Sequence, residues 1–321
     1  MNMHRFFSIS LTLLFASSSI AQVDQTIQQA QMQTRSAADT TGKIWTKGGV
    51  FSINFSQVQL INWAGGGVSS ASGNGLFNAF ANRKKGKHSW DNSIALAYGL
   101  MAQEDRKTFK TDDRLELNSK YVYEIGKSLY FSTLFQFRSQ FADGFKSVDD
   151  SIAISRFLAP AYVLLGVGFD YKPNDNFSLF VSPAMARFVI VADQTLADAG
   201  AFGVEAALRD TAGTIVTPGE NLDFQFGAYL NAQYKKDIAK NVNFFTRLEL
   251  FSNYLREPQN VDVIWETMWT FKVNDWLAAN LNTILLYDHD IDITRTEDNV
   301  VKTGPATQFK EVFGMGLTYK F

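Results

Sequence analysis

The chain has 321 residues, with 30 Lys and Arg against 32 Asp and Glu, and this near-balance of charge gives no basis for binding nucleic acid. It contains no cysteine, which excludes disulfides, thiolate metal sites and a cysteine nucleophile. Aromatic residues make up 14% of the chain and only 6 residues are proline, a composition that favours extended strands.

The N-terminus has the form of a secretory signal peptide. A basic pair precedes an apolar run from Phe6 to Phe15, and Ser19-Ile20-Ala21 has the small-x-small pattern that a signal peptidase accepts. The apolar run is too short to cross a bilayer as a helix. We therefore predict a signal peptide over residues 1–21.

Residues 22–45 are polar and precede the regular part of the sequence. Two interpretations are open for this segment. It forms either a disordered periplasmic arm or a short helix, centred on residues 25–31, that plugs the lumen of the domain that follows.

From residue 50 to the end, apolar and polar residues alternate. In the segment 113–125, Leu115, Leu117 and Tyr121 fall on one face, and Glu116 and Lys120 fall on the other. Alternation with a period of two predicts strands. Because such strands are only half apolar, a transmembrane barrel gives a weak hydropathy signal, which agrees with a mean hydropathy of −0.10.

The alternating segments number about twelve, and short and long connections alternate between them. Strands of roughly 11 to 15 residues exceed the 5 or 6 that are usual in soluble sheets. A β-sandwich would not sort its connections by length, whereas outer-membrane barrels have short periplasmic turns and longer extracellular loops. We therefore predict an all-β fold over residues 46–321, a transmembrane antiparallel β-barrel of about 12 strands. The predicted strands are 50–60, 75–83, 89–101, 113–125, 128–141, 157–171, 176–190, 222–236, 241–254, 261–273, 276–287 and 308–321.

Three further expectations follow from this strand assignment. Pro160 and Pro183 fall inside the sixth and seventh strands, where each removes a ladder donor, so we expect bulges there. An even strand number places both termini on the periplasmic side. The last strand ends in Phe321, which resembles the signal by which the barrel-assembly machinery selects its clients, and it should close the wall against the first strand near Phe51.

The inner face of the predicted barrel is charged and mixed in sign. A twelve-stranded wall encloses more room than an eight-stranded one. Two interpretations follow: the charges line a channel for small solutes and set its selectivity, or they pair with one another and plug the lumen. The candidate lumen residues are Glu116, Lys120, Glu124, Arg138, Lys235, Arg247, Glu249, Glu266 and Lys272.

Long loops hold the other candidate sites. Trp63, Gly65, Gly66 and Gly67 open the first loop and form either a constriction in the barrel mouth or only a tight loop. Residues 191–221 form the longest insertion and are the best candidate for an outward binding surface or lid.

A third loop carries Asp288, Asp290 and Asp292. These carboxylates are candidates for binding a divalent cation or bridging lipopolysaccharide, with a solvated loop as the alternative. His289 between them also permits an outer-surface hydrolase with an oriented general base. We identify no catalytic residues.

Several turn and loop motifs resemble a Bacteroidota outer-membrane family known only as a domain of unknown function. The resemblance covers residues 45–321 and implies the barrel and the outer membrane. It implies no activity and no catalytic residues. The motifs are Asn62-Trp63-Ala64-Gly65-Gly66-Gly67, Lys84-Lys85-Gly86-Lys87-His88, Lys110-Thr111-Asp112-Asp113-Arg114, Tyr171-Lys172-Pro173-Asn174-Asp175 and Gln233-Tyr234-Lys235-Lys236-Asp237.

The sequence therefore predicts a non-enzymatic, porin-like barrel in the outer membrane of a Gram-negative bacterium, with no cofactor. We expect it to be a passive pore or transport channel for small polar solutes. The alternative is a structural or partner-binding subunit of an outer-membrane assembly, and an outer-surface hydrolase comes third. Expected partners are outer-membrane lipid and lipopolysaccharide, the barrel-assembly machinery, and further subunits if the barrel is a homo- or hetero-oligomer.

Overall fold

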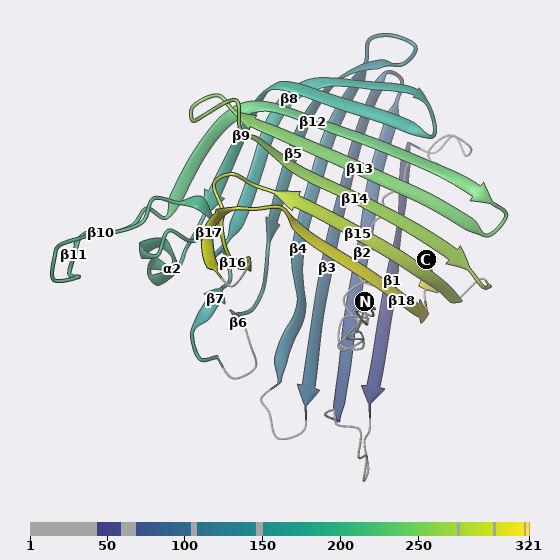
Figure 1. The fold of residues 1–321 in the computed structure, drawn as a ribbon. Helices are drawn as coiled ribbons and strands as arrows, with labels where there is room; N and C mark the ends of the chain where they lie inside the picture. The colour runs from purple at the N-terminus through teal and green to yellow at the C-terminus, as the bar shows by residue number, and fades with distance from the viewer. Residues whose placement is uncertain are drawn as a thin grey trace, which may run out of the picture.

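One antiparallel sheet makes up most of the molecule, and its two ends meet (Figure 1). The computed structural model describes residues 44–58, 69–103, 108–145, 150–274, 277–297, 300–317 and 319–320. The strand order is β18-β15-β14-β13-β12-β9-β8-β5-β4-β3-β2-β1-β19. Since β1 pairs with β19, with Val50 opposite Lys320 and Phe51 opposite Tyr319, the sheet closes into a barrel.

Within the described ranges the wall has twelve strands, because β18 and β19 are separated by a single residue and are counted together as the C-terminal strand. The prediction of about 12 antiparallel strands, and of closure near Phe51, is confirmed. The wall strands are β1 (Trp45–Val58), β2 (Ser70–Lys85), β3 (His88–Gln103), β4 (Phe109–Glu124), β5 (Leu129–Ser139), β8 (Ala161–Asn174), β9 (Phe177–Ile190), β12 (Leu222–Ala239), β13 (Val242–Asn253), β14 (Val261–Lys272), β15 (Leu277–Tyr287), β18 (Gln308–Leu317) and β19 (Tyr319–Lys320).

The strands form because successive side chains of a pleated strand point to opposite faces of the sheet. In β8, Leu165, Val167 and Phe169 are exposed on the outer face, while Leu164 and Asp170 are buried on the inner face. The outer face of the wall is therefore apolar and the inner face is largely polar or small.

Short and long connections alternate around the barrel, as predicted. The short ones are residues 86–87, 125–128, 175–176, 240–241 and 273–276. We call the end that carries them the turn end, and the opposite end the loop end. The turn at 86–87 follows from its sequence: Lys85 pairs with His88, and Gly86 has a φ of 59°, the left-handed conformation that two-residue hairpins need.

The two prolines have different outcomes. Pro183 lies in β9 at a bulge, where the pairing with β12 shifts from Gly227–Met185 to Tyr229–Ser182, so the predicted bulge is confirmed. Pro160 lies outside the wall, because β8 begins at Ala161 rather than at residue 157. The sixth strand was therefore predicted to start too early.

The loop end carries additional small elements, which gather there in Figure 1. Residues 191–221 pack around a small apolar cluster that includes Val191, Leu196 and Val204. Asp193 caps α2 by accepting a hydrogen bond from the backbone N–H of Leu196. No helix in the described ranges is long and apolar enough to cross a membrane. The small elements are β6 (Gly144–Phe145), β7 (Ala153–Ser155), α2 (Gln194–Asp198), η2 (Ala201–Gly203), β10 (Leu208–Arg209), β11 (Ile215–Thr217), β16 (Asp292–Glu297) and β17 (Val300–Pro305).

Candidate functional site

Five charged side chains of the inner face form one network, which we call the septum: Glu116, Arg138, Arg247, Glu249 and Glu266. Arg138 lies 3.8 Å from Glu116 and 3.5 Å from Glu249. Arg247 lies 3.3 Å from Glu249 and 2.9 Å from Glu266. The three glutamates are buried. The network therefore holds opposite charges together away from bulk solvent, where an unpaired charge would be costly.

Strand register explains part of the septum. Glu116 on β4 lies directly opposite Arg138 on β5, and Arg247 on β13 lies directly opposite Glu266 on β14. Directly opposed side chains in antiparallel pairs are close enough to interact. Alternation places these side chains on the inner face, and the strand register brings their opposite charges together.

One septum contact joins strands that are not neighbours in the wall. Arg138 belongs to β5 and Glu249 to β13, and three strands, β8, β9 and β12, lie between them in the sheet order. A contact between such strands must run through the interior of the barrel. The Arg138–Glu249 ion pair therefore crosses the lumen.

Two cavities lie on either side of the septum and share Glu116, Arg247 and Glu249 as walls. The turn-end cavity has a volume of about 500 Å³ and reaches turn residues such as Lys87. The loop-end cavity has a volume of about 360 Å³ and reaches Asp288. The lumen thus contains space at both ends, mixed polar and apolar at the turn end and largely apolar with charged groups at the loop end, with a charged constriction between them.

The turn-end cavity is rich in carboxamides, which form two chains ending on septum glutamates. Gln136 donates to Asn118 at 2.7 Å, and Asn118 donates to Glu116 at 2.9 Å. Gln233 donates to Asn231 at 2.8 Å, and Asn231 donates to Glu249 at 3.1 Å. These chains fix the carboxylates of the septum from the turn end.

A second basic group organises the loop-end cavity. Arg187 on β9 contacts the Asp262 carboxylate at 2.8 Å, donates to Gln225, and lies over the Phe251 ring at 4.3 Å from its centroid. Asp288 lies in the loop that follows β15, near Asp262. Burial raises the pKa of Asp288 to about 6, and the Asp262 carboxylate adds to the shift while Arg187 opposes it.

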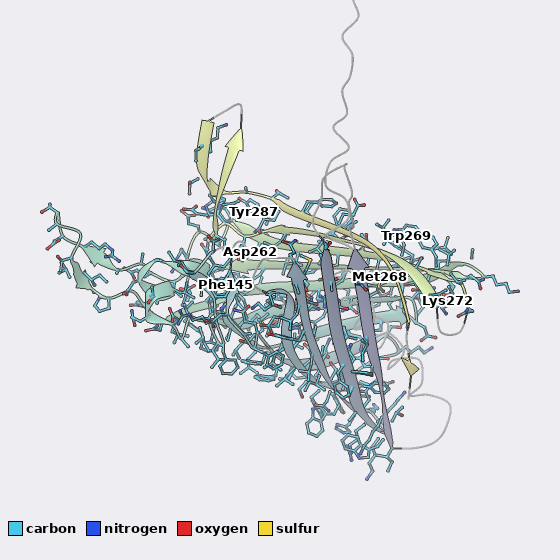
Figure 2. All side chains as sticks on the ribbon, turned by 90° about the horizontal axis from the view of Figure 1, so that it is seen from below. Phe145, Asp262, Met268, Trp269, Lys272 and Tyr287 are labelled. Atoms are coloured by element: carbon cyan, nitrogen blue, oxygen red, sulfur yellow. The ribbon has the colours of Figure 1, made fainter. Side chains whose placement is uncertain are left out.

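The structure places eight of the nine predicted lumen residues on the cavity walls: Glu116, Lys120, Glu124, Arg138, Lys235, Arg247, Glu249 and Glu266. Lys272 is the exception. It shares the inward register of Glu266 but is exposed at the turn end of β14, at the opposite end from Asp262 in Figure 2.

Arg187, Gln136 and Asp262 also line the cavities, although the sequence interpretation did not select them. The same alternation would have placed each of them on the inner face. Gln136 shares its face with Arg138, and Asp262 shares its face with Glu266, so the pattern that predicts the lumen residues applies equally to them.

The loop candidates have separate outcomes. Trp63, Gly65, Gly66, Gly67 and Phe321 lie outside the described residues, as does the predicted signal peptide. Among the described residues, no group of three or more His, Cys, Asp or Glu side chains is arranged to hold a metal ion, so the structure gives no support for a cation site at Asp288, Asp290 and Asp292.

The same loop holds His289, the residue behind the predicted hydrolase. Its ring contacts the Tyr287 hydroxyl at 3.2 Å and the exposed Glu257 carboxylate at 3.5 Å. These contacts provide no serine or threonine nucleophile for His289 to activate.

Residues 55–145 match a family model described as "Protein of unknown function (DUF3078)". This match confirms the predicted resemblance to a family without an established activity. No curated protein matches the sequence.

Three solved structures resemble the fold at low sequence identity. The translocator domain of the autotransporter NalP from Neisseria meningitidis is 11% identical, with a TM-score of 0.37, over 93% of this chain and 98% of that one. The COG4313 outer membrane channel from Pseudomonas putida F1 is 11% identical, with a TM-score of 0.41, over 88% of this chain and 98% of that one. The NanC porin is 8% identical, with a TM-score of 0.37, over 85% of this chain and 100% of that one. TM-scores this low carry no conclusion about function.

Proposed function

We propose that the chain is an outer-membrane β-barrel that passes small polar solutes through a charged lumen. The wall supports membrane insertion because its outer face carries large exposed apolar side chains around the barrel, among them Phe135, Leu165 and Trp265. Closure between β1 and β19 removes the sheet edges, which a bilayer does not tolerate. In this orientation the turn end faces the periplasm with both termini, and the loop end faces lipopolysaccharide and the cell exterior.

The observation that carries the transport proposal is the pair of cavities, each with charged residues in its walls, that meet at the septum. Each cavity extends from one end of the barrel toward Arg247 and Glu249. Rings of charged side chains are a common means of selecting solutes in membrane pores. The septum is then the constriction of the pathway, and displacement of its side chains, Arg138 among them, widens the lumen.

Liposome swelling tests this proposal. The refolded chain is incorporated into liposomes, and swelling is measured in iso-osmotic solutions of small sugars and amino acids. Swelling faster than that of protein-free liposomes supports a passage for small solutes. Liposomes that contain the folded barrel and remain as impermeable as protein-free ones contradict it.

A second candidate function, a partner-binding subunit of an outer-membrane assembly, is favoured by the hairpin β10–β11. This hairpin extends away from the wall at the loop end (Figure 1), and Leu208 and Val216 on it are 62% and 69% exposed. Exposed apolar side chains on a protruding segment are typical of interaction sites. Gentle detergent extraction of the native protein tests this function: migration with additional subunits supports it, and migration only as a monomer contradicts it.

A further inference from the structure

The two cavities differ in charge and in the chemistry of their walls. Among the side chains that the structure describes, eight Lys and Arg residues line the turn-end cavity against six Asp and Glu residues. In the loop-end cavity four described Lys and Arg residues stand against six Asp and Glu residues. Eight described carboxamides line the turn-end cavity, whereas the described lining of the loop-end cavity contains one, Gln140. The lumen is therefore polarised along its axis, with the cationic, amide-rich part at the turn end.

The excess of positive charge has a defined position. Lysines from the turns and from the turn-end halves of the strands surround this cavity, and they outnumber the acidic groups at the same end, Asp91, Glu124 and Asp175. Asp170 is paired with Lys120 at 2.7 Å, and Glu116 and Glu249 belong to the septum. A small anion that enters from the turn end therefore meets a net positive field before it meets the septum glutamates. The lysines that contribute are Lys84, Lys87, Lys120, Lys127, Lys172 and Lys235.

One buried group in this cavity lacks the hydrogen bond that its position requires. Gln136 is 6% exposed and uses its amide N–H₂ group on Asn118 and Glu116. Its Oε1 atom accepts no hydrogen bond from any part of the chain that the structure describes. A buried carbonyl oxygen without a donor costs free energy. This atom has almost no accessible surface, so a hydroxyl group of a bound solute satisfies it once the Gln136 side chain turns toward the cavity.

The rest of the cavity fits a solute of modest size with an apolar face. Its volume of about 500 Å³ lies within the usual range for small-molecule sites. Phe80, Phe177 and Phe180 contribute aromatic rings to walls that also carry the carboxamides. Such walls suit a solute that has both an apolar face and hydroxyl groups.

We propose that the turn-end cavity binds a small organic anion that carries hydroxyl groups, with a sugar acid as the representative class. The lysines attract the anionic group, and the carboxamides, with Gln136 Oε1 as an acceptor, bind the hydroxyls. This inference rests on the proposed function, because it names the class of solute that the lumen selects.

Isothermal titration calorimetry on the refolded full-length chain at low ionic strength tests the inference. Three probes are used. Glucuronate has both the anionic group and the hydroxyls, glucose has only the hydroxyls, and acetate has only the anionic group. We expect glucuronate to bind about tenfold more tightly than either of the others, a difference of about 1.4 kcal/mol. Glucose 6-phosphate as a fourth probe distinguishes a carboxylate preference from a phosphate preference.

Variants and salt locate the binding to the turn-end cavity. Lys235→Gln should weaken glucuronate binding several-fold and leave glucose binding unchanged. Arg256→Gln is the matched control, since Arg256 pairs with Asp223 at the loop end and is 53% exposed. Raising the salt concentration from about 20 mM to about 300 mM should weaken glucuronate binding but not glucose binding, because screening acts on the charge. Mobility on unheated gels shows that each variant is folded.

The outcomes separate this inference from the proposed function. Glucuronate that binds no better than glucose and acetate to a barrel that permits liposome swelling overturns the inference alone. Glucuronate binding that is lost equally in Lys235→Gln and Arg256→Gln also overturns it, because the site would then not be the turn-end cavity. Selective binding to a barrel that never permits swelling overturns the transport function and leaves the binding site established.

Discussion

Arg138 and Glu249 lie 3.5 Å apart across the barrel lumen, between Nη2 of one and Oε1 of the other, although 111 residues separate them in the chain. Both side chains also pair with a second charge, Arg138 with Glu116 and Glu249 with Arg247. The cross-lumen pair therefore links two strand-to-strand pairs into one septum. This link joins two parts of the wall that have three strands between them, so it bears on both the stability of the barrel and the width of its passage.

Substitutions at Arg138 and Glu249 should have coupled effects on the free energy of unfolding. Arg138→Met should lower the free energy of unfolding by about 3 kcal/mol, at the lower end of the cost of breaking a buried pair, because Arg247 still neutralises Glu249. Combining Arg138→Met with Glu249→Gln should cost less than the sum of the two single changes. Urea titrations of all four species in liposomes measure the coupling, which we expect to be about 1 to 3 kcal/mol. Strict additivity would show that the two side chains do not interact across the lumen.

Any side chain at Gly227, the glycine at the β9–β12 bulge, should destabilise the barrel. A Cβ atom at Gly227 on β12 would overlap the backbone carbonyl oxygen of Ser252 on β13. Gly227→Ala should therefore destabilise the barrel by about 1 to 3 kcal/mol through overpacking. Gly75→Ala on β2 is the matched control, since no atom lies within 4 Å of its ideal Cβ position. Equal refolding yields for both variants would count against the described β12–β13 packing.

The cost in stability of a charged substitution on the outer face should depend on how deep the residue lies in the bilayer. Phe135 lies in the middle of β5 and is exposed on the outer face, so Phe135→Lys should cost about 2 to 4 kcal/mol if this face contacts lipid. Ile238 is also exposed but lies at the turn end of β12, so Ile238→Lys should cost about 1 kcal/mol or less. Unfolding titrations in liposomes provide the comparison. If the two substitutions cost the same, this face does not lie in a bilayer.

Asp288 should make stability depend on pH. The pKa of this carboxyl is raised to about 6 by burial and by Asp262, so the folded chain holds the proton at pH values where the unfolded chain has lost it. The resulting stabilisation is present below about pH 4 and is lost as the pH rises toward 6. Wild type should therefore gain stability relative to Asp288→Asn when the pH falls from about 6 to about 4. A difference between the two that does not change with pH would contradict the raised pKa.

The strands of the wall could be predicted because their signals are local. Alternation assigns each strand a face, and turn residues such as Gly86 mark the hairpins, so twelve strands and their loop parity follow from short windows of sequence. Pro160 shows where this reasoning fails. The apolar residues Phe157, Leu158 and Ala159 precede it, but the chain there forms loop structure after β6 and β7, and the wall resumes only at Ala161.

The septum could be predicted only in part. Alternation places Arg138 and Glu249 on the inner face, but their contact depends on the curvature and diameter of the closed barrel, which no local pattern specifies. The balance between an open and a plugged lumen therefore could not be decided from the sequence. The separation of the cavities into a cationic and an anionic part has the same origin, because it depends on which strand ends meet in space.

Single-channel recording in planar bilayers tests the central claim most directly. The refolded chain should produce discrete conductance steps, and Arg138→Ala should produce larger steps, because it removes the side chain that crosses the lumen. Both proteins must first migrate as folded barrels on unheated gels. A complete absence of steps from both folded proteins, or steps of identical size, would contradict a lumen that conducts solutes through the septum.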